Sequence, residues 1–392
     1  MNLRSLPFWF ASLLAPCLSA QTVEIAFKVG TWNLEFLGAE GNFRNNLPPR
    51  VDTDFAAIGR KVAELGVCVL AVQEICGEAP LQKVAKGAGP SWQVLLGTTG
   101  GWDDGKTAQN IGFLYDRNTV ELLHAEELLE LPREHEGQPI FHRVPVTACF
   151  RHQPSGCDFR LVTVHLKAGQ KAQDELKRRG EATALAAWLD GLNKGSEDAD
   201  VVLLGDFNST YGKDPETLFE QSKQRRYLDH KTPVPTIMHF PEPIDHVVAG
   251  TGFRELRADS LAVDGDFDGM ERDAWRRIYS DHFPVTATIV AHSDDDPQAT
   301  FRRGPNTNHL PRPRDGEVRI PVPGTTKPPV VVGGEPWPPK VGSKLRVLTQ
   351  DGPREGTLAF PMPEGNTGWL VLQTDQGVVG IAVPRVWTIY VL

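Results

Sequence analysis

The sequence predicts an α+β fold in which layers of mainly antiparallel strands carry a few helices. Short apolar runs recur between residues 23 and 291, and two of them flank a turn signal at residues 153–156, as in a hairpin. Two segments, 52–65 and 171–193, instead have apolar residues at helical spacing and end close to a glycine. Because strands and helices do not alternate regularly, a purely parallel sheet is not expected.

The strands are predicted from two kinds of pattern. Residues 23–33 alternate between apolar and polar side chains, which is typical of a half-buried strand, whereas residues 67–75 form a continuous apolar run, which is typical of a fully buried one. The same two patterns predict the remaining strands of this region, in order at 92–96, 111–115, 141–150, 159–166, 201–206, 244–248 and 280–285.

The first 20 residues suggest that the protein is exported. One charged residue, Arg4, precedes an apolar stretch that closes in Leu-Ser-Ala, which is typical of a secretory signal peptide and predicts a secreted or periplasmic protein. No segment is long and apolar enough to span a bilayer. The net charge of −9 becomes more negative when Arg4 is removed, so a polyanionic substrate requires a local basic patch or a bound cation.

Polar side chains follow several of the apolar strands at the point where each strand ends. Residues 201–208 show this most clearly, because four apolar residues and Gly205 lead directly into Asp206 and Asn208. One such residue is usually a turn former. Eight of them in one chain indicate a shared site instead, and the other six are Asn33, Glu74, His165, Asp245, Asp281 and His282.

These residues belong to short motifs that occur in a recognisable order. The motifs are Thr31-Trp32-Asn33, Val72-Gln73-Glu74, Thr163-Val164-His165-Leu166, Gly205-Asp206-Phe207-Asn208, Ile244-Asp245-His246 and Ser280-Asp281-His282. They resemble the successive motifs of the endonuclease/exonuclease/phosphatase superfamily, over roughly residues 23–291. The resemblance implies a four-layered α/β sandwich, with two packed, mainly antiparallel sheets flanked by helices. It also implies divalent-metal-dependent cleavage of phosphate esters.

The expected metal is Mg²⁺, or Mn²⁺ in its place. Glu74 is a hard oxygen ligand suited to a cation that keeps several waters and takes few protein ligands. By resemblance, Asn33 and Asp281 lie close to the same ion. Asp206 then holds or deprotonates the attacking water, and Asn208 orients the phosphate.

The resemblance also assigns the basic groups of the site. His282 and His165 are expected to hydrogen-bond the phosphoryl oxygens, or His165 protonates the leaving group. Asp245 pairs with a histidine and sets its tautomer and basicity. Arg143 matches a family arginine that contacts phosphate.

Two charged segments have simpler explanations. Residues 264–269 begin like an EF-hand loop, but Trp275 stands where that loop needs a glutamate, so an acidic surface loop is expected rather than a Ca²⁺ site. The basic residues after His165 form either a local patch for a polyanion or a solvated helix face, and they are Lys167, Lys171, Lys177, Arg178 and Arg179.

Four cysteines remain after the predicted signal peptide. Cys149 and Cys157 flank the turn at residues 153–156, and export permits disulfides, so we expect these two to form one. Cys68 lies within an apolar strand and is expected in the core, and Cys76 is expected to be free.

After about residue 296 the composition changes. Residues 297–340 are rich in proline and hold no sustained periodic segment, which predicts a semi-rigid linker between a catalytic domain at 21–296 and a C-terminal module. Residues 341–392 contain five short alternating runs with turns between them, which predicts a small β-barrel that resembles an SH3-like module. Such a module either tethers the enzyme to a surface, polymer or protein or stabilises the catalytic domain.

The leading functional hypothesis is an exported, metal-dependent nuclease that acts on DNA or RNA. A phosphodiesterase or phosphatase for phospholipid head groups or inositol phosphates is the alternative, because the same kind of site serves both classes of substrate. A third hypothesis is an inactive binding protein, and the complete set of eight site residues argues against it.

Overall fold

The computed structural model describes most of residues 24–291 and parts of the chain beyond them. The described residues are 24–39, 44, 47–97, 99–100, 108–192, 198–210, 225–228, 234–291, 294–297, 299, 301, 318–321, 340–349, 352–361, 369–375, 377–382 and 386–391. The predicted signal peptide at residues 1–20 lies outside them. Within the described residues no helix is both long and apolar enough to cross a membrane.

The first of two large sheets has six strands in the order β13-β14-β1-β2-β4-β3. Its strands are β1 (Ile25–Leu37), β2 (Val67–Ile75), β3 (Trp92–Leu96), β4 (Asn110–Asp116), β13 (Ala262–Val263) and β14 (Val285–Ala291). The central pair β1 and β2 is parallel, and all other pairs in this sheet are antiparallel.

The second sheet repeats this plan with the order β11-β12-β10-β9-β8-β5. Its strands are β5 (Val120–Glu127), β8 (Val146–His152), β9 (Asp158–His165), β10 (Val201–Asp206), β11 (Arg225–Tyr227) and β12 (Asp245–Gly250). Again one central pair, β9 and β10, is parallel and the others are antiparallel. A separate two-stranded ribbon consists of β6 (Glu134–His135) and β7 (Gln138–Pro139).

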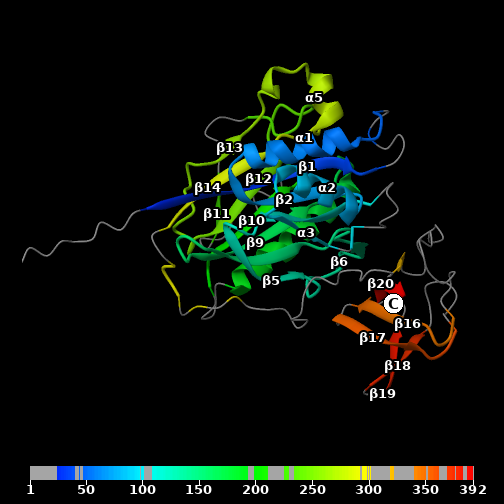
Figure 1. The fold of residues 1–392 in the computed structure, drawn as a ribbon. Helices are drawn as coiled ribbons and strands as arrows, with labels where there is room; N and C mark the ends of the chain where they lie inside the picture. Colours follow the sequence, from blue (N-terminus) through cyan, green and yellow to red (C-terminus); the bar gives the residue numbers. More distant parts are fainter. Residues whose placement is uncertain are drawn as a thin grey trace, which may run out of the picture.

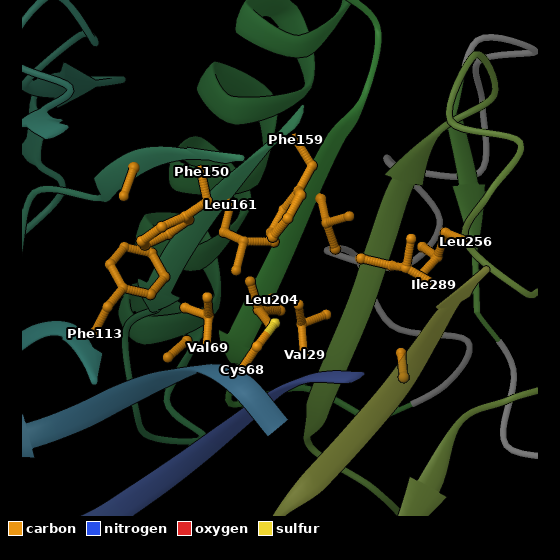
Figure 2. Close-up of a cluster of buried hydrophobic side chains, with 14 of the residues drawn as sticks. Val29, Cys68, Val69, Phe113, Phe150, Phe159, Leu161, Leu204, Leu256 and Ile289 are labelled. Carbon is orange, nitrogen blue, oxygen red and sulfur yellow. The ribbon is translucent and has the colours of Figure 1, made fainter. Parts of the chain in front are cut away.

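The helices cover the outer faces of the two sheets (Figure 1). The inner faces pack on each other through apolar side chains such as Val29, Val69 and Phe113 of the first sheet and Phe159 and Leu204 of the second (Figure 2). The outer face of the first sheet packs on α1 (Asp52–Glu64) and α2 (Glu78–Ala88), and that of the second on α3 (Ala172–Leu192). The predicted layered α+β fold, with two mainly antiparallel sheets between helices, is therefore confirmed.

Two helices were not expected from the sequence. One is α5 (Arg272–Ile278), which follows a short 3₁₀ turn, η1 (Phe267–Gly269). The other is α2, which contains Pro80 and Gly87 and so has weak helix propensity. A Cβ atom on Gly87 would lie 2.9 Å from the Cα of Ala56, so this glycine lets α2 pack closely against α1. Tertiary packing therefore outweighs local propensity here.

The C-terminal region forms an antiparallel sheet of six strands in the order β15-β20-β16-β17-β18-β19. These strands are β15 (Val318–Pro321), β16 (Lys344–Thr349), β17 (Gly352–Leu358), β18 (Trp369–Thr374), β19 (Gly377–Ala382) and β20 (Val386–Val391). The five predicted strands are present. A closed barrel would need β15 to pair with β19, and the described residues contain no such pairing, so the sheet is open.

The C-terminal sheet also begins earlier in the sequence than predicted. Residues 318–321 fall inside the segment expected to be a linker, yet they form β15 and pair with β20. A proline is tolerated in an edge strand because one side of that strand makes no ladder hydrogen bonds. The rest of the predicted linker lies largely outside the described residues.

The predicted disulfide between Cys149 and Cys157 is wrong in this structure, where both thiols are free and buried. The hairpin register pairs Cys149 with Arg160, and His152 N–H donates to the carbonyl of Cys157. The two cysteines are thus offset by three residues, about 10 Å along the strands, and point to opposite faces of the sheet. That offset exceeds the reach of a disulfide. Cys68 lies in the core between the sheets, as expected.

Candidate active site

The central parallel pair of each sheet places polar residues at one end of the sandwich. In the first sheet β1 carries Asn33, paired in register with Gln73, and β2 carries Glu74 next to it. In the second sheet Asp206 of β10 lies directly between His165 of β9 and Asp245 of β12. The register of three neighbouring strands therefore aligns a histidine and two carboxylates in one row.

The backbone dihedral angles depart from regular strand values at several residues of this site. Glu74 and Asn208 have φ values of 59° and 51°, in the left-handed region that non-glycine residues rarely adopt. Gly205 has φ 146°, and a Cβ atom there would lie 2.1 Å from the carbonyl oxygen of Val164. Glycine is thus required immediately before Asp206, because it lets β10 approach β9 closely. Such departures from favoured geometry are common at functional sites.

Asp206 is the centre of the hydrogen-bond network. Its Oδ2 accepts from Asn33 Nδ2 at 3.0 Å, and its Oδ1 accepts from the backbone N–H of Asn208 at 2.8 Å. The Nε2 atoms of His165 and His282 lie 3.5 and 3.8 Å from the same Oδ2. Burial raises the pKa of Asp206 to about 6, although His282 acts in the opposite direction. This carboxylate can therefore exchange a proton near neutral pH.

His282 is held as a cation by a buried partner. Its Nδ1 donates to Asp245 Oδ2 at 2.9 Å, and its backbone N–H donates to the hydroxyl of Ser280, which donates in turn to the carbonyl of Asn33. Burial opposes the charge, but Asp245 and Asp206 outweigh it, so the pKa of His282 lies well above its usual value. The predicted pairing of Asp245 with a histidine is thus present, and Thr236 Oγ1 orients Asp245 by accepting its backbone N–H.

His165 is in the opposite charge state. Burial and the neighbouring guanidinium of Arg143 lower its pKa well below the usual value, so the imidazole is neutral at pH 7. Arg143 donates through Nε to the carbonyl of His165 and through Nη2 to the carbonyl of Leu166. It also donates to the side chain of Gln109. Arg143 therefore positions the end of β9 as well as facing the site.

A pocket of about 210 Å³ opens at this end of the sandwich. Seven of the predicted site residues line it, namely Glu74, Arg143, His165, Asp206, Asn208, Asp281 and His282. The two remaining ones, Asn33 and Asp245, are buried behind Asp206 and His282, to which they are hydrogen-bonded. The structure therefore brings all nine together, seven at the surface of the pocket and two as supports.

Comparison with solved structures shows which known fold this chain shares. An endonuclease/exonuclease/phosphatase from Bacteroides vulgatus superposes with a TM-score of 0.50 at 17% identity, covering 68% of this chain and 98% of that one. A protein of the same description from Bacteroides thetaiotaomicron also gives 0.50 at 17% identity, covering 69% and 99%. The chain has the endonuclease/exonuclease/phosphatase fold. No protein-family model and no curated protein matches the sequence.

The donor set of this endonuclease/exonuclease/phosphatase fold suits a divalent cation beside Glu74. The Glu74 and Asp281 carboxylates both line the pocket, whereas the amide oxygen of Asn33 accepts the backbone N–H of Glu35 at 3.0 Å. Burial and the repulsion of Asp281 raise the pKa of Glu74 to about 7, which shows that negative charge is crowded here. Crowded hard oxygen ligands are what Mg²⁺ or Mn²⁺ requires.

A second group close enough to share an ion consists of Asp206, Asp245 and His282, all of them buried. The 2.9 Å contact between His282 and Asp245 is a direct hydrogen bond, and a metal on Nδ1 would have to replace its proton. We therefore assign this group to proton and phosphate handling and the Glu74 side of the pocket to the cation.

Glu35 and Arg276 also belong to the pocket region and were not found from the sequence. Glu35 lines the pocket, and its carboxylate pairs with Arg276 at 2.6 Å and with Arg44 at 3.4 Å. Arg276 in turn lies 3.6 Å from Asp281. Glu35 stands two positions after Asn33, but its φ of 42° and the irregularity between Asn33 and Leu37 break the strand alternation there, so no periodic pattern marks it in the sequence. Nothing local marks Arg276, because α5 brings it in from a distant part of the chain.

The structure shows the partners of the acidic loop at residues 264–268 and of the basic segment that follows His165. In the loop at residues 264–268, the ammonium of Lys61 lies 2.8 Å from Asp264 and 2.9 Å from Asp268, so a lysine already neutralises this loop and no Ca²⁺ is required. In the basic segment, Arg178 is buried and donates to the carbonyls of Lys167 and Gly169, whereas Lys171 and Arg179 are exposed. Part of the segment is therefore structural and part is available at the surface.

Proposed function

We propose that this protein is an exported, divalent-metal-dependent nuclease that hydrolyses phosphodiester bonds of DNA or RNA. The observation that carries the proposal is the pocket itself, which is lined by a cationic histidine, a neutral histidine and the four carboxylates of Glu35, Glu74, Asp206 and Asp281. Hydrolysis at a phosphoryl group needs positive hydrogen-bond donors, a proton acceptor for water and a hard cation, and these residues supply the first two and oxygen ligands for the third. The succession of sequence motifs that resemble the endonuclease/exonuclease/phosphatase superfamily supports the same conclusion.

The chemistry follows from the charge states of the residues. Glu74 and Asp281, with Asn33 by resemblance, would hold Mg²⁺ or Mn²⁺, which would supply positive charge against the charge that develops on the phosphate. Asp206, with its pKa near 6, holds the attacking water and accepts its proton. Asn208, which lines the pocket from the next turn, orients the phosphate.

The two histidines bind the phosphoryl oxygens in different ways. His282 donates from its charged imidazolium, which Asp245 maintains. His165 is neutral, and its buried Nδ1 has no hydrogen-bond partner, so a tautomer with the proton on Nε2 donates toward the pocket. This favours His165 as a hydrogen-bond donor over the alternative role of a general acid.

Exposed basic side chains in two segments that adjoin pocket residues favour a polymer as substrate. Lys171 and Arg179 are exposed in the segment that follows Ala168 of the pocket wall. Arg272 and Arg277 are exposed in the helix that leads to Asp281, where Arg272 also donates to the carbonyl of Met238 and Arg277 lies 3.7 Å from Asp54. A phosphodiester within a nucleic acid extends in both directions from the reacting phosphate, and neighbouring phosphates would meet these cations.

The proposal is tested by an assay with and without a chelator. We expect plasmid DNA or RNA to be cleaved in the presence of Mg²⁺ and cleavage to stop when EDTA is added, because the carboxylates alone repel the phosphate. A chromogenic phosphodiester, a phosphoinositide vesicle and an inositol phosphate serve as parallel substrates. Faster hydrolysis of the lipid or inositol phosphate than of either nucleic acid would refute the nuclease assignment, and no hydrolysis at all would favour a binding protein.

For the C-terminal sheet we propose the role of a tether. None of the pocket residues lies within residues 341–392, so the sheet acts through binding and not through chemistry. We expect a chain that ends after Phe301, whose ring lies 5.4 Å from the guanidinium of Arg160, to keep its turnover on a small soluble phosphodiester. Its efficiency on a polymeric or surface-bound substrate should fall. An insoluble or inactive truncated chain would show that the sheet is part of the catalytic unit.

A further inference from the structure

A second cluster of acidic side chains lies at the other end of β10 from the active site. It consists of Asp200, just before β10, and of Asp294, Asp295 and Asp296, just after β14. One carboxylate oxygen of each lies within 4.8 Å of the others. The strand β10 separates this cluster from Asp206 by six residues, or roughly 20 Å.

The cluster combines one buried carboxylate, Asp200, with the half-buried Asp294 and Asp296 and the exposed Asp295. Asp200 is 2% exposed, and its buried Oδ2 has no hydrogen-bond partner among the described residues. Two further buried oxygens have no hydrogen-bond partner among the described residues. They are the Oδ2 of Asp198, a residue that is also 2% exposed, and the Oδ1 of Asp296. A buried carboxylate normally needs a hydrogen bond or a cation to offset its loss of hydration.

The acidic loop at residues 264–268 differs from this cluster because a lysine pairs with its carboxylates. There the ammonium of Lys61 sits between Asp264 and Asp268 and supplies the positive charge. At the cluster around Asp200, no lysine or arginine forms an ion pair with any of the four aspartates in the part of the chain that the structure describes. Arg151 comes near but pairs with Asp158, at 3.0 Å.

We propose that Asp200, Asp294, Asp295 and Asp296, with Asp198 beside them, form a Ca²⁺ site that is separate from the catalytic centre. Ca²⁺ accepts six to eight oxygen ligands in flexible geometry, so it suits several carboxylates from two chain segments better than Mg²⁺ does. The electrostatics agree with this assignment. Burial and Asp198 raise the pKa of Asp200 to about 10, and burial raises that of Asp198 to about 8, so the ionised cluster is costly without a cation.

The position of the site indicates its effect. Asp200 belongs to the second sheet, where its carbonyl accepts from the backbone N–H of Arg160 at 2.7 Å. Residues 294–296 follow β14 of the first sheet. An ion bound between them links the two sheets at the end opposite the pocket. The site therefore stabilises the sandwich and takes no part in the reaction.

The test measures Ca²⁺ binding in the full-length Glu74→Gln protein, so that an ion at the catalytic pocket does not contribute. After chelation, we expect added Ca²⁺ to raise the melting temperature by on the order of 5–10 °C at a hundredfold excess over Kd. Isothermal titration calorimetry should show one site. Adding Asp200→Asn should abolish both signals, and it should raise the melting temperature of the Ca²⁺-free protein because it removes the cost of burying a carboxyl group that is ionised in the unfolded chain.

The matched control is Asp266→Asn in the same background, which alters an acidic loop that Lys61 already neutralises and should leave Ca²⁺ binding unchanged. If the Asp200→Asn chain does not fold, Asp295→Asn replaces it, because Asp295 is exposed, and Ca²⁺ affinity should fall at least about tenfold. No effect of Ca²⁺ on the Glu74→Gln protein would overturn the proposal. So would Ca²⁺ binding that survives Asp200→Asn, or that disappears with Asp266→Asn.

Discussion

Replacing Glu74 by glutamine is expected to lower kcat/KM on DNA or RNA by at least about a hundredfold at millimolar Mg²⁺. The substitution keeps the shape of the side chain, and the amide oxygen can still accept the backbone N–H of Phe36, which lies 3.2 Å from Glu74 Oε2. What it removes is the negative charge that binds the cation. The concentration of Mg²⁺ needed for half-maximal activity should therefore rise as well.

Stability gives an independent check on the Glu74→Gln protein. Because burial raises the pKa of Glu74 to about 7, its ionised form is disfavoured by folding, and this cost is present above pH 7. A neutral glutamine removes that cost, so the melting temperature at pH 8 should be equal to that of the wild type or higher. Glu121→Gln, at an exposed glutamate of β5, serves as the control with the same change of charge and should be fully active. Near-normal activity of Glu74→Gln with unchanged Mg²⁺ dependence would remove Glu74 from the mechanism.

The second large effect is expected from His282→Ala, which should lower kcat by about a hundredfold to a thousandfold. This histidine carries its positive charge into the pocket, where charge develops on the phosphoryl oxygens, and removal of one such donor typically costs that much. Single-turnover cleavage of a chromogenic phosphodiester at saturating Mg²⁺ measures the chemical step. His239→Ala, at an exposed histidine of the adjoining loop, should change the rate less than tenfold.

The His282→Ala protein should also be less stable, because Asp245, 1% exposed, loses the cation that offsets its buried charge. The double variant Asp245→Asn/His282→Ala has no unpaired buried charge and should regain most of the lost melting temperature while it stays inactive. If the double variant regained activity together with stability, the effect of His282→Ala would be structural, and His282 would have no direct role in the reaction.

The site was easier to predict from the sequence than the fold around it. All eight residues taken from the apolar runs lie at one end of the sandwich, because polar side chains beside buried strands are a local signal. His165 and Asp206 end their strands as predicted, but Asp245 begins β12, and Asp281 and His282 precede β14 instead of ending a strand. Glu35 and Arg276 were missed because their importance depends on contacts with each other and with Asp281. The helix α2 was missed because close packing against α1, and not local propensity, stabilises a segment that contains Gly87.

The errors have a common cause, since each concerns how distant segments meet. The disulfide was inferred from a turn between Cys149 and Cys157, but the hairpin register places the two thiols on opposite faces of the sheet. The C-terminal barrel was inferred from five strands, but closure depends on pairing of the terminal strands, and these do not pair in the described residues. Likewise, β15 lies within the predicted linker, yet it belongs to the C-terminal sheet because it pairs with β20.

The sequence by itself determined the kind of layers, most of the strands, and seven of the residues that line the pocket, because periodicity and strand ends are local features. The tertiary structure decided how those residues differ. His165 and His282 have the same side chain, yet burial beside Arg143 leaves the first neutral, and a hydrogen bond to Asp245 keeps the second charged. The two acidic segments differ in the same way: Lys61 reaches one of them, and no described lysine or arginine pairs with the other. Charge state depends on which groups are brought within a few ångströms, and this is set by the packing of segments that are far apart in the chain.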